Sequence, residues 1–86
     1  MKEFSYVVKD PLGIHARPGG MIARIAKKYE NTAVCICKGE KTAVASQLIR
    51  LISLGIHNGD SVVVQADGPE EDAAIEELHK FFEKNL

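Results

Sequence analysis

Residues 13–18 read Gly-Ile-His-Ala-Arg-Pro and combine a histidine, an arginine and a proline at the expected start of a helix. The first N–H groups of a helix have no internal acceptor, and this end carries about half a positive charge, so it attracts anions. An imidazole can accept a phosphoryl group and hand it on. The motif therefore predicts a phosphorylation site at His15, with Arg17 and the backbone holding the phosphate. The same residues also fit a solvent-exposed helix end without chemistry.

Two features of this motif stay open from the residues alone. Pro18 suits a first helical turn, yet proline disfavours helical backbone at Arg17, so the capping residue is His15, Ala16 or Arg17. Gly19-Gly20 follows directly, and two glycines in a helix cost about 1 kcal/mol each relative to alanine. Their presence has two possible explanations. Either a phosphate or a partner approaches the backbone closely here, or the glycines are sequence drift that the helix tolerates.

Periodicity predicts the elements that must position the motif. Alternation favours a strand over Glu3 to Lys9, and apolar residues at helical spacing follow the motif up to Tyr29, with basic residues on the outer side. A strand over Thr32 to Lys38 and a return strand over Lys41 to Val44 come next, and the Val62 to Val64 run is a fourth strand. Pro69 is expected to open a last, acidic-started helix. The predicted fold class is α+β, an antiparallel sheet with helices on one side.

The segment Gln47 to Leu54 is predicted to be a short helix with Ser46 as N-cap candidate and Gly55 as a left-handed stop. Its apolar side chains cover more of the circumference than one buried stripe requires. Some of them must therefore be exposed or covered by a partner.

Composition bounds the remaining possibilities. The 86 residues allow one domain, 1–86, and the formal net charge of −1 disfavours non-specific nucleic-acid binding. No apolar run is long enough for a membrane span or a secretory signal, so a cytoplasmic protein without a membrane partner is expected. No cofactor is expected. Cys35 and Cys37 fall short of a zinc site and are interpreted as small buried side chains on a strand.

The whole chain resembles the HPr family, the histidine-containing phosphocarriers of the bacterial sugar phosphotransferase system. The resemblance is carried by residues 13–18, Ala26-Lys27-Lys28-Tyr29, Ser53-Leu54-Gly55-Ile56, Gly59 and Asp67-Gly68. It implies four antiparallel strands with three helices packed on one face. It also implies a stoichiometric carrier rather than a turnover enzyme. His15 would take a phosphoryl group on Nδ1 from enzyme I, which is charged by phosphoenolpyruvate, and pass it to the A domain of a sugar-specific enzyme II. Arg17 would neutralise the phosphate.

Docking in this family uses the first two helices. By position, the resemblance implies partner contacts at Gly20, Met21, Arg24, Lys27, Leu48, Ile49 and Ile52. This would explain the excess of apolar side chains on the second helix. The basic residues would meet acidic surfaces on enzyme I and enzyme II.

The resemblance also raises regulation through a serine. Many Gram-positive members carry a regulatory serine at the start of the second helix, modified by a serine kinase/phosphorylase and recognised by a catabolite-control regulator. Ser46 has the usual number, but counting back from Leu54-Gly55 places Gln47 there, one residue being inserted near Gly39-Glu40. Ser46 is therefore either a regulatory site or a plain N-cap.

The strand register of the family implies that Ala33, Cys35 and Cys37 face the helices. Val34 and Ile36 would then lie on the open side of the sheet with Val7 and Val63. This apolar stripe suggests a weak homodimer as the alternative to a monomer. A second function class also remains, an HPr-derived regulatory module that docks on a transcription regulator or an enzyme without carrying phosphate. The presence of His15 and Arg17 weighs against that class.

Overall fold

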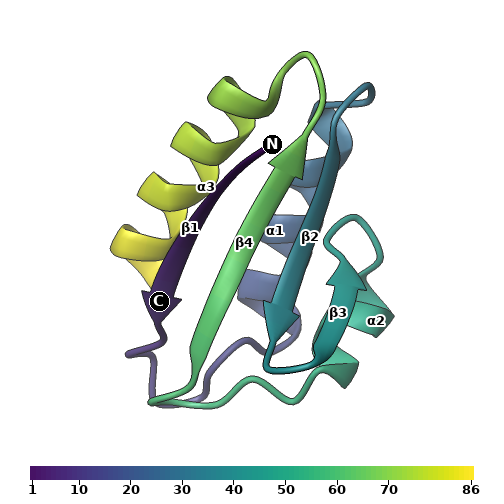
Figure 1. Cartoon of the computed structure of the whole chain (residues 1–86). Helices are drawn as coiled ribbons and strands as arrows, with labels where there is room; N and C mark the ends of the chain where they lie inside the picture. Colours follow the sequence, from purple (N-terminus) through teal and green to yellow (C-terminus); the bar gives the residue numbers. More distant parts are fainter.

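The computed structural model describes all 86 residues, and its strands and helices build two layers. The elements are β1 (Lys2–Val7), α1 (Ala16–Lys28), β2 (Ala33–Lys38), β3 (Lys41–Val44), α2 (Leu48–Ser53), β4 (Ser61–Asp67) and α3 (Glu71–Asn85). The strands form one antiparallel sheet in the order β1-β4-β2-β3. All three helices lie behind this sheet in Figure 1. The expected α+β architecture is confirmed. No helix is both long and apolar enough to cross a membrane.

The core lies between the sheet and the helices and is filled by every second strand residue. On the central strand β4, Val62, Val64 and Ala66 are completely buried. Phe82 of α3 is equally buried and meets the rings of Phe4 and Tyr6 edge-on, with centroids 5.5 Å away in each case. Such aromatic pairs add about 0.5–1.5 kcal/mol each beyond the area that they bury. They attach the last helix to the first strand.

The inward face of β2 is the reverse of the expected one. Val34 and Ile36 are 3% and 0% exposed, and they lie opposite Ala66 and Val64 of β4. Residues that pair across an antiparallel ladder share a face, so both belong to the core. A shift of one residue would bury two thiols and expose these larger apolar side chains, at a cost in hydrophobic free energy. The expectation that Ala33, Cys35 and Cys37 face the helices is therefore wrong.

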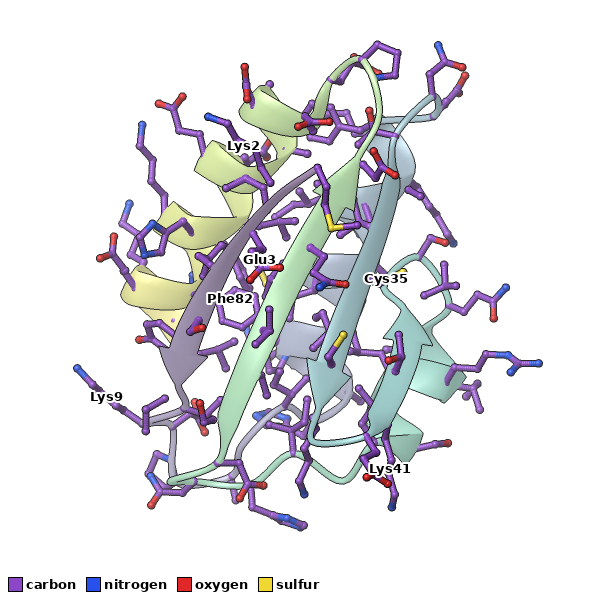
Figure 2. The ribbon with its side chains drawn as sticks, viewed as in Figure 1. Lys2, Glu3, Lys9, Cys35, Lys41 and Phe82 are labelled. Atoms are coloured by element: carbon purple, nitrogen blue, oxygen red, sulfur yellow. The ribbon has the colours of Figure 1, made fainter.

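The open face of the sheet changes accordingly. Cys35 and Cys37 lie there, partly exposed, so the interpretation as buried core side chains is also wrong. Figure 2 labels Cys35 and Glu3 on this face, and Gln65 lies between them and donates to Glu3 Oε1 at 3.1 Å. Only two members of the expected stripe remain on this side, Val7 and Val63. The homodimer hypothesis thereby loses its continuous apolar stripe.

Helix α2 starts one residue later than expected. Gln47 is its N-cap, and its carbonyl accepts the Leu51 N–H at 3.0 Å. The Gln47 N–H in turn donates to Val44 O at 3.1 Å, which places Ser46 inside the preceding turn. Ser46 is therefore not the N-cap, because the short connection from β3 forces a turn at this position. The stop is confirmed, since Gly55 has a φ of +66°.

The two glycines of α1 have different surroundings. A Cβ atom on Gly19 would lie 3.1 Å from Leu48 Cδ1 and 3.7 Å from Ile52 Cγ1, so a bare backbone lets α2 pack closely against α1. A Cβ atom on Gly20 would meet nothing within 4 Å. The close approach at Gly19 thus comes from this chain's own second helix.

The orientation of β2 is tested by a pair of neighbouring alanine variants. Ile36→Ala should lower the free energy of unfolding by about 2–5 kcal/mol, because it removes buried apolar volume. Cys35→Ala, on the open face, should cost about 0.5 kcal/mol or less. Urea denaturation measures both, and equal losses would contradict the assignment of the two faces.

The glycine pair provides a second test. Gly20→Ala should stabilise the protein by about 0.5–1 kcal/mol, because alanine loses less backbone entropy in a helix and space is available. The melting temperature should rise by about 4–8 °C per kcal/mol gained. Gly19→Ala should gain less, since Leu48 must move to make room. A larger gain at Gly19 than at Gly20 would show that the packing of α2 is looser than described.

Candidate phosphoryl-acceptor site

The N-terminus of α1 is capped by His15. Its backbone is extended, with φ −110° and ψ −172°, and its carbonyl accepts the Gly19 N–H at 2.8 Å. The choice that the sequence left open is thus decided in favour of His15. Pro18 is the third helical residue, where a missing N–H breaks no helical hydrogen bond. The His15 side chain makes no capping hydrogen bond and is partly exposed, so its ring is available to a reactant.

An anion at this helix end would find unsatisfied donors. The N–H groups of Ala16 and Arg17 have no hydrogen-bond acceptor within the protein. They belong to the positive end of a 13-residue helix. The Arg17 side chain is exposed and forms no ion pair inside the chain. A guanidinium can bind two phosphate oxygens at once.

His15 and Arg17 line an open, shallow pocket of about 270 Å³. The complete lining is Asp10, His15, Arg17, Pro18, Met21, Phe81 and Asn85. Sequence reasoning missed Asp10, Phe81 and Asn85. Asp10 is close in sequence and could have been considered, whereas the last turn of α3 is brought here only by tertiary packing. The pocket is large enough for a phosphate-sized group and too open to enclose a larger substrate.

The loop before His15 is held by a close backbone contact. Gly13 has a φ of +68°, and a Cβ atom there would overlap the Ile56 carbonyl. That carbonyl accepts the Ile14 N–H at 3.1 Å. Figure 1 shows the two segments meeting below β1 and β4, so the loop from α2 to β4 supports the residue next to His15. Glycine is required at position 13 both for its backbone conformation and for space.

The expected docking residues lie on α1 and α2, and one of them, Met21, also lines the pocket. On α1, Met21 is 46% exposed, and Arg24 and Lys27 are exposed without an internal ion pair. On α2, Ile49 is 76% exposed, whereas Leu48 and Ile52 are half-buried around Gly19. Gly20 is half-buried in the neighbouring turn. Of the extra apolar side chains on α2, Leu48 and Ile52 pack against α1, and Ile49 is exposed to solvent. We refer to these seven residues as the α1–α2 surface.

The other candidate residues lie elsewhere. Ser46 is half-buried in the turn before α2. His57 is exposed next to Asp60, and His79 stacks on Phe4 with ring centroids 4.6 Å apart. No three His, Cys, Asp or Glu side chains are grouped so as to hold a metal ion. Burial raises the pKa of the Cys35 thiol, and the neighbouring Cys37 adds to this, which disfavours a thiolate.

Comparison with known proteins identifies the family. Residues 2–84 match the family described as "PTS HPr component phosphorylation site". The chain is 36% identical to the phosphocarrier protein HPr of Mycoplasma genitalium over 85 residues, 99% of this chain and 97% of that protein. A crystal structure of HPr from Thermoanaerobacter tengcongensis has a TM-score of 0.91 at 31% identity and covers 98% of this chain and 93% of that one.

A relative with a different role has the same fold. Crh, described as a catabolite repression containing protein of Bacillus subtilis that forms a swapped dimer, has a TM-score of 0.77. It is 26% identical and covers 100% of this chain and 98% of its own. The match to the family over almost the entire sequence decides the assignment. The chain belongs to the HPr family of phosphocarrier proteins of the phosphotransferase system.

Proposed function

We propose that this protein accepts a phosphoryl group on His15 from phosphorylated enzyme I and passes it to the A domain of a sugar-specific enzyme II. The observation that carries the proposal is the position of His15. Its free ring lies at the N-terminus of α1, in an open pocket shared with Arg17, next to two unsatisfied backbone N–H groups. A regulatory module without phosphate chemistry would have no use for this combination.

The transfer needs a nucleophilic nitrogen and a place for negative charge. The unprotonated Nδ1 of His15 attacks phosphorus, and an N–P bond forms as the bond between phosphorus and the donor breaks, the donor keeping that electron pair. Arg17 and the N–H groups of Ala16 and Arg17 balance the charge on the phosphoryl oxygens. The reverse sequence delivers the group to the acceptor. The pocket is open, so two successive partners can each reach the same nitrogen.

The α1–α2 surface is proposed to bind both partners. Ile49 and Met21 supply exposed apolar contact area, and Arg24 and Lys27 supply positive charge that no internal carboxylate neutralises. Unpaired basic side chains attract acidic surfaces and speed encounter, which suits a complex that must dissociate quickly. Half-buried Leu48 and Ile52 contribute mainly through the packing of α2 on Gly19.

The acceptor role is tested by incubation with phosphoenolpyruvate and bacterial enzyme I. One acid-labile phosphate, followed by native mass spectrometry, should appear on the wild type and be absent from His15→Ala. His79→Ala is the matched control, since this histidine lies on α3 away from the pocket and should leave phosphorylation intact. Arg17→Ala should slow transfer about 10- to 100-fold, the loss of one charged hydrogen bond. An unphosphorylated wild type, beside an active control carrier, would favour the regulatory module.

Docking is tested by a separate pair of variants. Ile49→Ser should raise the KM for this protein in the enzyme I reaction about tenfold, because an exposed apolar contact is lost while the core is untouched. Val7→Ser is the control, since Val7 is 52% exposed on the opposite, open face of the sheet. Steady-state phosphorylation rates and melting temperatures are measured for both. Equal effects on KM would contradict the proposed surface.

A further inference from the structure

The ammonium of Lys38 occupies an unusual place among the lysines of this chain. Its Nζ donates to Gly55 O at 2.6 Å and lies 3.0 Å from Asp60 Oδ2. Its side chain is only 30% exposed, whereas the lysines of the other three lysine ion pairs are 56%, 58% and 74% exposed. A partly buried pair is screened less by solvent and salt. Lys38 therefore differs from the surface charges.

The two oxygens that Lys38 contacts belong to the first and last residues of one loop, residues 55–60. Gly55 follows the C-cap of α2, Leu54, so its carbonyl lies just beyond the negative end of that helix. Asp60 precedes β4, and its Oδ2 also accepts the His57 N–H at 2.8 Å, while its own N–H donates to His57 O at 3.0 Å. The His57 N–H and then the Lys38 ammonium hold the pKa of Asp60 below its ordinary value. Lys38, the last residue of β2, thus holds residues 55–60 at both ends.

This loop supports the segment that carries His15. Four hydrogen bonds join residues 55–60 to residues 8–14: Val8 N–H to Asp60 O at 2.9 Å, Gly59 N–H to Val8 O at 2.7 Å, Asn58 Nδ2 to Lys9 O at 2.9 Å, and Ile14 N–H to Ile56 O at 3.1 Å. The last bond involves the residue directly before His15. Gly13 packs so closely against Ile56 and His57 that even a Cβ atom would not fit between residues 8–14 and residues 55–60. A movement of the loop therefore moves the cap of α1.

We propose that Lys38 is a positioning residue for His15, acting through Gly55 and Asp60 on residues 55–60 and through Ile56 on Ile14. Lys38 lines neither the pocket nor the α1–α2 surface, so it affects the site only through this loop. The consequence for phosphoryl transfer rests on the proposed function. The consequence for the geometry of the loop does not.

The experiment compares Lys38→Met with Lys41→Met. Methionine keeps most of the apolar stem and removes the ammonium, and Lys41 is the matched control, an exposed lysine of the same hairpin without an ion pair (Figure 2). In Lys38→Met, the Ile14 amide should exchange with solvent about five- to tenfold faster, because its acceptor is no longer fixed. The His15 ring resonances should shift, and Lys38→Arg should restore both readouts. Lys41→Met should change neither.

Three comparisons keep the outcome decisive. The Val64 amide, in the central strand, is the internal reference, and equal acceleration there would overturn the proposal by showing global destabilisation. Unchanged Ile14 exchange and His15 resonances in a folded Lys38→Met protein would also overturn it. If Lys38→Met does not fold, Asp60→Asn weakens the same contact while keeping an oxygen for the His57 N–H, and the same readouts apply.

Phosphoryl transfer separates this proposal from the function on which it depends. If both hold, Lys38→Met should lower the maximal rate of phosphorylation by enzyme I. The KM for this protein in that reaction should stay unchanged, since the docking residues are intact. A wild type that accepts no phosphate, together with faster Ile14 exchange in Lys38→Met, would reject the proposed function and keep the positioning role. Normal transfer by the wild type with a raised KM only in Lys38→Met would reject the positioning role.

Discussion

The position of His15 depends on the contact of Gly13 with the Ile56 carbonyl. His15 is at the end of a helix whose other contacts lie along its buried side, and the preceding loop has no regular structure to hold it. The left-handed backbone of Gly13 and the bond from Ile14 to Ile56 fix that loop on a second one. Because the second loop connects α2 to β4, His15 is tied to α2 and to the central strand together.

This constraint explains how a small domain can carry a reactive group without enclosing it. A chain of 86 residues has one core, and here every helix uses its apolar side to cover the same sheet face. Chemistry is left to a helix end, where unsatisfied N–H groups and a dipole are available without a cavity. An open pocket with the exposed α1–α2 surface nearby fits the proposed transfer, in which two partners would use the same atom in turn.

The basic and acidic side chains differ in whether they are paired within the chain. The net charge is −1, but the five acidic residues of α3 all have a basic partner within the chain. Glu77 accepts from Lys28 at 2.7 Å and from the Tyr29 hydroxyl at 2.6 Å, and its carboxylate raises the pKa of Tyr29 to about 12. Arg17, Arg24 and Lys27 have no such partner within the chain. The bulk charge disfavours non-specific binding of polyanions, and the free local charge is the feature on which the proposed contact with acidic protein surfaces rests.

The sequence alone determined the element order, the start of a helix within residues 15–17 and the stop at Gly55, because these follow from local periodicity and backbone preference; the structure chose His15 as the cap. The sequence did not determine which face of β2 is buried. Alternation fixes only that Val34 and Ile36 share one face and the two cysteines the other, and pairing with β4 decided between them. The cap at Gln47, the pocket lining from Phe81 and Asn85, and the Lys38 contacts were likewise decided by tertiary structure. Each of them joins residues distant in sequence or depends on how a connection closes, and local spacing carries no information about either.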